Sequence, residues 1–309
     1  MKIAINAPFS EENMELISRA APGCEVVCGL ENSHGAEIFI GKPTDSPDLS
    51  SLKLFQSTSA GVEGLLSAGL PDGVIITNTT GAFGGVIAEY VLAGILALSR
   101  DLFRYRDSQK RHIWQPLGNE SMLLGKNALI LGCGDLGRET AKRLRAFGVN
   151  TSGIRRTPAP AESFDRVFGG DMLDSLLPEA DYVICCLPHT SETVRMLDGR
   201  RLGLMKQGSL LVNVGRGSLV DTQALLPLLN SGRISGAVLD VFDNEPLPES
   251  SPLWDMENVL ITPHISGPSF GHFPEVERLI ADICADNISR FLAGKPLRNI
   301  VSRSNGYCV

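Results

Sequence analysis

The sequence lacks an excess of positive charge. Among its 309 residues, 28 are Lys or Arg and 35 are Asp or Glu, so the formal net charge is −7. A nucleic-acid surface needs clustered positive charge, and this balance argues against nucleic acid as a partner. The sequence also lacks an apolar run of the roughly 20 residues that cross a membrane. The longest run, Val86 to Leu98, includes Glu89 and predicts a buried helix instead.

Cysteines spaced as in a metal site or a disulfide framework are also missing. The seven cysteines are an odd number, and Cys185 and Cys186 are neighbours with no His pair nearby. Several cysteines lie in apolar strands, which is typical of small core side chains in a reduced protein. The segment Met1 to Ile5 predicts a strand rather than a signal peptide. We therefore expect a cytoplasmic protein with no metal and no membrane contact.

What the sequence does contain is a strand, a glycine-rich turn, a helix and a second strand in succession. The apolar run Ala128–Leu131 leads into Gly132-Cys133-Gly134-Asp135-Leu136-Gly137, and Gly148 ends the helix. In such a motif the first glycine permits the tight turn, the second lets backbone approach a pyrophosphate, and the third lets helix pack on strand. The helix N-terminus offers free N–H groups to phosphates. The pattern predicts a bound dinucleotide.

The end of the second strand lacks the acidic residue that usually marks a site for NAD. An Asp or Glu there accepts hydrogen bonds from the ribose 2′-OH, but this chain has Arg155, Arg156 and Thr157. Two guanidinium groups suit a 2′-phosphate, so we expect NADP(H) to be preferred, with NAD(H) possible. The alternative is that both arginines are solvated loop residues.

The first 84 residues alternate strands and helices, which predicts a small α/β domain with a parallel sheet. A Gly/Ser-rich segment, Ser57–Val62, follows the fourth strand and either presents N–H groups to an anion or is an ordinary loop. A long helix is predicted over Gly84–Ser99, and the basic stretch Arg100–His112 is more typical of a solvated helix face than of a substrate site. The predicted strands are Lys2–Asn6, Cys24–Cys28, Ala36–Ile40, Leu52–Gln56 and Val74–Thr77.

Three successive strands in the second half are each followed by a side chain with catalytic chemistry. These side chains are Arg216, Glu245 and His264. In an open parallel sheet, ligands bind outside the carboxyl ends of the strands, so one rule places all three at the edge where the dinucleotide lies. The strands are predicted over Ser209–Val214, Ile234–Val241 and Val259–Ile261, after an earlier one over Ala180–Cys186.

The three side chains suit hydride transfer between a nicotinamide and a carbonyl carbon. His264 is the type of group that exchanges a proton near neutral pH, and a carboxylate beside it favours the charged ring. Arg216 would hold the anionic and polarised oxygens of a 2-keto acid. Each residue alone also has an ordinary structural explanation, so the hypothesis depends on their mutual geometry.

Several motifs together resemble the D-isomer-specific 2-hydroxyacid dehydrogenase family over nearly the whole length. They are Ser59–Val62, Ala88–Tyr90, Gly132–Gly137, Asn213–Gly217, Leu239–Pro246 and Thr262–Gly267. The resemblance implies that Arg216 binds substrate, that Glu245 pairs with His264, and that His264 is the acid/base. It also implies that backbone groups of Ala60, Gly61 and Val62 hold the substrate carboxylate. The cofactor contacts that we assign are Gly132, Gly134, Asp135, Leu136, Gly137, Arg155, Arg156, Thr157, Cys186, Leu187, Pro188, Thr193, Val214, Gly215, Asp240 and Gly267.

The resemblance also implies an α/β architecture with two domains. Residues 85–267 are expected to form a Rossmann-type doubly wound parallel sheet that binds the dinucleotide. Residues 1–84 and 268–309 are expected to form a smaller flavodoxin-like substrate domain, to which the helical pattern Val276–Leu292 returns. Family members are usually homodimers through the cofactor domain.

The paired arginines resemble the NADPH-using glyoxylate and hydroxypyruvate reductases of the family, which implies a small 2-keto acid substrate and a D-2-hydroxy acid product. Glu245 stands where the formate-oxidising branch has Gln, and Asp135 puts a negative charge near the phosphates, next to Arg138. Three alternatives remain. They are a regulatory NAD(P)-binding protein without turnover, an NAD-dependent dehydrogenase of another 2-hydroxy acid such as 3-phosphoglycerate, and a reductase of non-acid carbonyls.

Overall fold

The computed structural model describes residues 1–42, 44–45, 47–48, 50–67, 70–268 and 270–303. The chain forms two compact units. Unit 1 comprises Met1–Phe83 and Pro268–Val309, and unit 2 comprises Gly84–Gly267. In sequence, therefore, the chain leaves unit 1 just before Gly84 and re-enters it just after Gly267.

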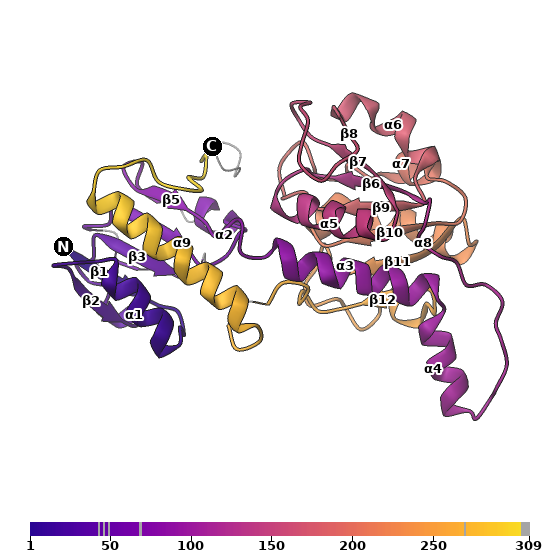
Figure 1. The fold of residues 1–309 in the computed structure, drawn as a ribbon, viewed down its shortest axis with the longest axis horizontal. Coiled ribbons are helices and arrows are strands. Elements are labelled where there is room, and N and C mark those ends of the chain that lie inside the picture. The colour runs from indigo at the N-terminus through magenta and orange to yellow at the C-terminus, as the bar shows by residue number, and fades with distance from the viewer. Residues whose placement is uncertain (43, 46, 49, 68–69, 269, 304–309) are drawn as a thin grey trace. The chain divides into compact units, whose positions relative to one another are not determined.

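Unit 1 is built on a five-stranded parallel sheet with the strand order β2-β1-β3-β4-β5 (Figure 1). This is the flavodoxin-like order. The two strands β3 and β4 are buried along their whole length, as apolar runs in a central parallel sheet should be. The strands are β1 (Lys2–Ile5), β2 (Glu25–Cys28), β3 (Ile38–Gly41), β4 (Leu54–Ser57) and β5 (Ile75–Thr77).

The helices of unit 1 include one from each end of the chain. Helix α1 (Glu11–Arg19) packs against the C-terminal helix α9 (Pro274–Leu292), and a short α2 (Glu63–Ser67) follows β4. Glu277 joins α9 to the start of α1, because its carboxylate accepts the Ser10 N–H at 2.7 Å and the Asn13 amide at 2.8 Å. The C-terminal helix therefore packs within unit 1.

Unit 2 is built on a seven-stranded parallel sheet with the strand order β12-β11-β10-β9-β6-β7-β8. The first strand of the unit lies in the middle and the order reverses between β6 and β9, which confirms the doubly wound, Rossmann-type prediction. The strands are β6 (Asn127–Leu131), β7 (Asn150–Ile154), β8 (Arg166–Phe168), β9 (Tyr182–Cys185), β10 (Ser209–Asn213), β11 (Ile234–Leu239) and β12 (Val259–Ile261).

Helix α3 (Gly84–Ser99) is the apolar run near the start of unit 2, and it packs against α5 (Asp135–Ala146) and β11. A Cβ on Gly94 would lie 2.8 Å from the side chain of Val238, so glycine permits the close approach of α3 to the sheet. Glu89 is the charged residue of this run, and its carboxylate reaches Arg143 of α5 at 3.4 Å. The other helices of the unit are α4 (Leu102–Lys110), α6 (Leu173–Leu176), α7 (Gly199–Leu204) and α8 (Thr222–Asn230).

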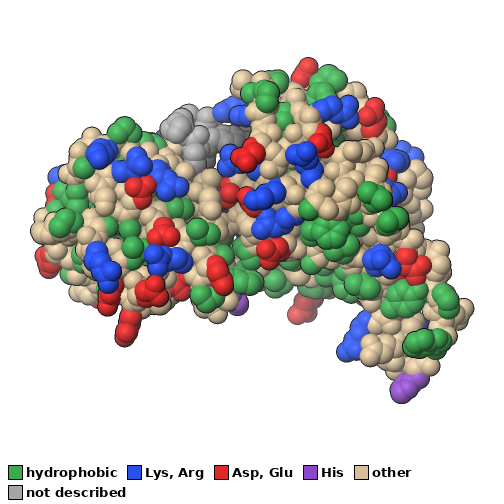
Figure 2. Space-filling model, viewed as in Figure 1, with side chains coloured by type: hydrophobic (Ala, Val, Ile, Leu, Met, Phe, Trp, Pro, Cys, Tyr) green, Lys and Arg blue, Asp and Glu red, His purple; other side chains and the backbone are tan. Residues whose placement is uncertain are grey.

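Charged side chains of both signs are interspersed over the face shown in Figure 2. The basic stretch after α3 forms α4, where Arg104 pairs with Asp101 and Lys110 pairs with Asp107. The Lys110–Asp107 pair is exposed on a solvated helix face, as the composition of the stretch suggests, whereas the Asp101 side chain, just before α4, is only 18% exposed. None of the helices in the described part of the chain is long and apolar enough to cross a membrane.

Candidate active site

The carboxyl ends of β10, β11 and β12 lie at one edge of the unit 2 sheet, because these neighbouring strands are parallel. Arg216 follows β10, Glu245 follows β11, and His264 follows β12. The glycine-rich turn follows β6 and therefore leaves the sheet at the same edge. The structure thus brings the predicted catalytic side chains and the dinucleotide motif to one side of one sheet.

Glu245 and His264 form a hydrogen-bonded pair. One carboxylate oxygen of Glu245, Oε2, lies 2.8 Å from Nδ1 of His264, and the other, Oε1, accepts the Phe242 N–H at 3.0 Å. Both oxygens are therefore held, so the carboxylate fixes the imidazole plane. With Nδ1 directed at the carboxylate, Nε2 is the ring nitrogen left to exchange a proton with a substrate.

The side chain of His264, which follows β12, is 51% exposed, and its backbone conformation is unusual. Its φ of +55° lies in the left-handed region, which non-glycine residues seldom adopt. The His264 N–H donates to the carbonyl of Asp240 at 2.9 Å, and this bond stabilises the bend. The strained conformation is thus maintained by the end of the neighbouring strand β11.

Asp240 is a fully buried carboxylate that organises the segment around His264. Its Oδ1 accepts the hydroxyl of Thr262 at 2.6 Å and the N–H of Ile265 at 2.8 Å, and its Oδ2 accepts the N–H of Ser266 at 2.9 Å. A buried charge is tolerated only when such donors replace water. Asp240 therefore ties together the residues on both sides of His264.

The turn that carries Arg216 packs directly on the backbone before Glu245. The Asn213 amide donates to the carbonyl of Arg216 at 3.0 Å and stabilises the turn. A Cβ on Gly217 would lie 1.9 Å from the carbonyl carbon of Phe242, so only glycine fits between these two segments. The loops bearing the guanidinium and the carboxylate are consequently in backbone contact.

The glycine-rich turn has the geometry that a pyrophosphate site requires. Gly132 has a φ of +109°, and a Cβ on Gly137 would lie 1.9 Å from the carbonyl oxygen of Gly132. A Cβ on Gly134 would meet nothing within 4 Å, so no protein packing demands glycine there. Open space over the middle glycine, at the N-terminus of α5, is what close approach of a phosphate needs. The residues present fit a dinucleotide.

Asp135, which the sequence places near the phosphates, directs its carboxylate at another helix. Oδ2 accepts the N–H of Gly84 at 2.9 Å, at the first residue of α3. The partial positive charge of a helix N-terminus favours a carboxylate in that position. The hydrogen bond joins the phosphate-binding turn to the point where the chain enters unit 2.

Arg155, Arg156 and Thr157 follow β7, which pairs with β6 in register up to Ile154 opposite Leu131. Arg155 is half-buried, and Arg156 and Thr157 are exposed. Burial raises the pKa of the Cys133 thiol in the glycine-rich turn to about 11, and the nearby Arg155 guanidinium partly opposes that rise. Arg155 is thus electrostatically close to the turn. The described residues include no carboxylate in an ion pair with Arg155.

Three further segments carry the other expected cofactor contacts. The segment after β9 is fixed by Thr193, whose hydroxyl donates to the carbonyl of Pro188 at 2.7 Å. A Cβ on Gly215 would lie 2.6 Å from the carbonyl oxygen of Leu187, so the segments after β9 and β10 touch.

Burial raises the pKa of the Cys186 thiol to about 12, so its sulfur remains a neutral thiol. Val214 is buried beside the contact between the segments after β9 and β10, and Gly267 is the last residue of unit 2.

The expected substrate contacts Ala60, Gly61 and Val62 lie in unit 1, directly after β4. The amide of Asn78 donates to the carbonyl of Ala60 at 2.7 Å, and the Ser57 hydroxyl accepts the Ser59 N–H at 3.0 Å. These bonds fix the carbonyl of Ala60 and the start of the turn within unit 1.

One pair of residues near His264 was not predicted to interact. The hydroxyl of Tyr90, on α3, lies 2.6 Å from the hydroxyl of Thr262. The two residues belong to motifs visible in the sequence, but no local signal connects positions 172 residues apart.

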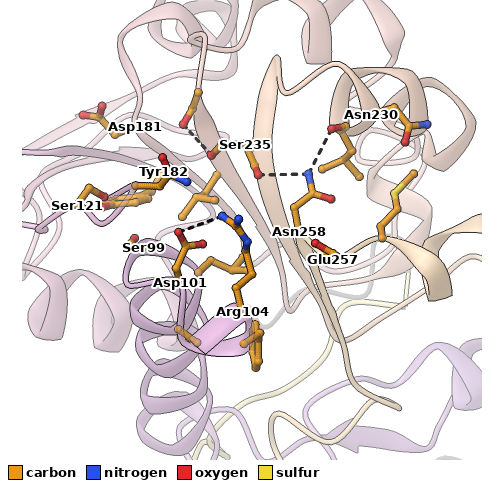
Figure 3. A pocket seen from close by; sticks show the side chains of 18 of the residues that line it. Ser99, Asp101, Arg104, Ser121, Asp181, Tyr182, Asn230, Ser235, Glu257 and Asn258 are labelled. Atoms are coloured by element: carbon orange, nitrogen blue, oxygen red, sulfur yellow. Dashed lines mark hydrogen bonds and ion pairs between the residues drawn. The ribbon is translucent and has the colours of Figure 1, made fainter. Parts of the chain in front are cut away.

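A large hollow lies at the opposite edge of the unit 2 sheet, away from the catalytic side chains. It encloses about 740 Å³, and its lining includes the amino ends of β9, β10 and β11 and the start of α4. Figure 3 shows Asp101 paired with Arg104 in this hollow, which Ser235 and Asn258 also line. Because its position is at the wrong end of the strands for a dinucleotide, it is not the reaction site.

Comparison with known proteins gives the family. Residues 92–266 match the NAD binding domain of D-isomer specific 2-hydroxyacid dehydrogenases. A glyoxylate reductase from Korarchaeum cryptofilum is 34% identical over 245 residues, which cover 75% of this chain and 70% of that protein. A crystal structure of a D-isomer specific 2-hydroxyacid dehydrogenase family protein from Aeromonas salmonicida is 34% identical, with a TM-score of 0.87 over 98% of this chain and 99% of that one.

A second solved structure is an NADPH-dependent glyoxylate/hydroxypyruvate reductase from Sinorhizobium meliloti, in complex with NADP and sulfate. It is 28% identical, with a TM-score of 0.84 over 99% of each chain. The whole architecture, and not the dinucleotide motif alone, is therefore shared with these proteins. This chain belongs to the D-isomer specific 2-hydroxyacid dehydrogenase family and is an NAD(P)-binding oxidoreductase of that family.

Proposed function

We propose that this enzyme reduces a small 2-keto acid of the glyoxylate or hydroxypyruvate type to a D-2-hydroxy acid, with NADPH as the hydride donor. The observation that carries the proposal is the Glu245–His264 pair, 2.8 Å between Oε2 and Nδ1, at the sheet edge that also carries Arg216 and the glycine-rich turn. The glyoxylate reductases among the relatives support the substrate class.

In the proposed reduction, His264, Glu245 and Arg216 have different roles. The reduced nicotinamide, when bound, supplies the hydride to the carbonyl carbon. His264 gives the proton on Nε2 to the carbonyl oxygen and recovers one from water after the product leaves. Glu245, whose Oε2 faces Nδ1, stabilises the charged ring before transfer. Arg216 binds the substrate carboxylate and the polarised oxygen, and the backbone N–H groups of residues 60–62 bind the carboxylate as well.

A substrate panel tests this assignment. Purified protein is mixed with NADPH or NADH and with glyoxylate, hydroxypyruvate, pyruvate or a non-acid aldehyde, and loss of reduced cofactor is followed by absorbance. We expect the small 2-keto acids with NADPH to give the highest kcat/KM. Cofactor binding without turnover on any substrate would favour a regulatory protein, and turnover of the aldehyde alone would favour a different reductase. Oxidation of 3-phosphoglycerate with NAD would favour the other dehydrogenase.

The preference for NADP rests on Arg155 and Arg156, which stand where an acidic ribose reader is otherwise found. Arg155→Asp should shift the ratio of kcat/KM values toward NADH, because a carboxylate repels a 2′-phosphate and accepts from a 2′-hydroxyl. Arg19→Asp, an exposed change in unit 1, is the charge-matched control. An unchanged ratio in Arg155→Asp would show that the phosphate is read elsewhere or not at all. The remaining cofactor contacts assigned from the sequence are part of the same proposal.

We further propose a homodimer that forms through unit 2. Helix α4 and the irregular segment 111–122, together called the arm, project from the rest of unit 2 (Figure 1). Trp114, on the arm, is 101% exposed, and apolar side chains gather at this end of unit 2 in Figure 2. The hollow of about 740 Å³ lies at the base of the same arm. A second copy that covers Trp114 would also close the hollow beside it, and exposed apolar side chains such as Trp114 mark interfaces.

Light scattering on the purified protein tests the dimer. We expect twice the chain mass, and we expect Trp114→Ser to shift the equilibrium toward the monomer. Met172→Ser, which alters an exposed apolar residue away from the arm, should leave the mass unchanged. A monomeric wild-type protein would contradict the proposal.

We also propose a reducing, cytoplasmic compartment, because the six described cysteines are free thiols; Cys308 lies outside the described residues. Titration of seven thiols in the freshly denatured protein would support it.

A further inference from the structure

A chain of hydrogen bonds connects the side of α3 to the residues that flank His264. The Tyr90 hydroxyl lies 2.6 Å from the Thr262 hydroxyl, which lies 2.6 Å from Oδ1 of Asp240. The Asp240 carboxylate then accepts the backbone N–H groups of Ile265 and Ser266, at 2.8 and 2.9 Å. The series begins on one helix and ends on both sides of the catalytic imidazole.

The direction of each bond follows from counting protons. An ionised Asp240 carboxylate can only accept, so the single hydroxyl hydrogen of Thr262 must be donated to it. The Thr262 oxygen is then left as an acceptor, so the phenol of Tyr90 must donate its hydrogen. Burial raises the pKa of Tyr90 to about 12 and the Asp240 charge adds to the rise, so the phenol keeps its proton at any working pH.

Thr262 and Asp240 also bear on the backbone of His264. The His264 N–H donates to the carbonyls of Asp240 and Thr262, at 2.9 and 3.1 Å, while its φ is +55°. A residue in that region stays there only when its surroundings determine the conformation. A rotation of the Thr262 side chain would release Oδ1 of Asp240 from one of its two donors and loosen this bend.

We propose that Tyr90 is a positioning residue of the active site, whose hydroxyl acts through Thr262 and Asp240 to hold the imidazole of His264 in line with Glu245. Tyr90 is not a catalytic residue, because its hydroxyl donates its hydrogen to Thr262 rather than to a substrate. The inference deepens the proposed function and rests on the acid/base role of His264. It uses only contacts within unit 2.

Tyr90→Phe is the direct test, since it removes one oxygen and keeps the ring. We expect kcat to fall about tenfold, a part of the ~10²–10⁴-fold that a well-placed acid/base supplies, and KM for the cofactor to change by a smaller factor. Tyr182→Phe is the matched control. That tyrosine is buried in unit 2 and its hydroxyl bonds to Ser99, but it lies at the other edge of the sheet.

Thr262→Val and the double variant complete the kinetic test. Because both single changes break one series of bonds, their effects on kcat should be less than additive in the double variant. An unchanged kcat in Tyr90→Phe would overturn the proposal. Equal losses of kcat in Tyr90→Phe and Tyr182→Phe would overturn it too, since they would indicate general loosening.

Side-chain nitrogen NMR of the histidines gives a readout without turnover. The chain has five histidines, and His264→Gln identifies the resonance of interest. We expect Tyr90→Phe to shift the ring nitrogen signals of His264 and Tyr182→Phe to leave them in place. Shifted signals in a protein that turns over no keto acid would support the positioning role and reject the proposed function. Unshifted signals would reject the positioning role alone.

Discussion

Replacement of Gly217 by Ala tests whether the loops bearing Arg216 and Glu245 are packed in direct backbone contact. The added Cβ would lie 1.9 Å from the carbonyl carbon of Phe242, 2.2 Å from its oxygen and 2.4 Å from the Asp243 nitrogen. Non-bonded carbon atoms prefer a separation of about 3.5–4.0 Å. The contacts are all with backbone, which has no flexible end to swing away, so the two segments must move apart by more than about 1 Å.

The expected cost has a structural and a catalytic part. Overpacking of this kind typically destabilises by ~1–3 kcal/mol, offset by about 0.4–1 kcal/mol because alanine restricts the unfolded chain. Phe242 also donates its N–H to Glu245 at 3.0 Å, so a shift there moves the carboxylate that holds His264. A misplacement of about 1 Å in a catalytic constellation costs on the order of 10²-fold in rate.

Urea unfolding and steady-state kinetics measure the two parts. We expect Gly217→Ala to lower the free energy of unfolding by about 1–2 kcal/mol and kcat/KM by about 100-fold. Gly203→Ala is the control, because it lies in α7 and its Cβ would meet nothing within 4 Å. That change should be neutral or stabilising by up to about 1 kcal/mol. Wild-type activity and stability in Gly217→Ala would refute the contact between the two loops.

Two further predictions concern charged groups. Arg216→Ala should lower kcat/KM for a 2-keto acid by ~10²–10³-fold, the scale for an oriented donor to developing charge, with Arg216→Lys in between; a change of less than threefold would argue against a carboxylate contact. Asp135→Ala should weaken cofactor binding more than Asp135→Asn. The amide oxygen of Asn can still accept the Gly84 N–H that lies 2.9 Å away, so Asn still joins the phosphate-binding turn to the start of α3. Cofactor fluorescence titrations measure both Asp135 variants, and equal affinities would contradict that reasoning.

Chain order alone was enough to bring Arg216, Glu245 and His264 to one edge, because every strand that precedes them is parallel to its neighbour. The tight turn at Gly132 and the close packing at Gly137 followed from the glycine spacing in the same way. The bounds of the elements were less accurate: predicted strands at Ala36 and Leu52 begin at Ile38 and Leu54. The three-residue β8 was missed, since Arg166–Phe168 pairs on only one side and is too short for a pattern.

Long-range side-chain contacts were beyond prediction from the sequence. Asp135 stood out as an unusual charge, but its partner at Gly84 lies 51 residues away and depends on how α3 packs against α5. The bonds from Tyr90 to Thr262 and from Thr262 to Asp240 depend equally on helix placement and on rotamers. Such contacts require tertiary packing, which neither periodicity nor spacing encodes.

The most direct test of the account is single-turnover oxidation of bound NADPH by glyoxylate, in the wild type and in His264→Gln. We expect rapid oxidation in the wild type and a rate about 10²–10⁴-fold lower in the variant, with unchanged NADPH affinity. A variant that oxidises NADPH at the wild-type rate would contradict the assignment of His264 as the proton donor.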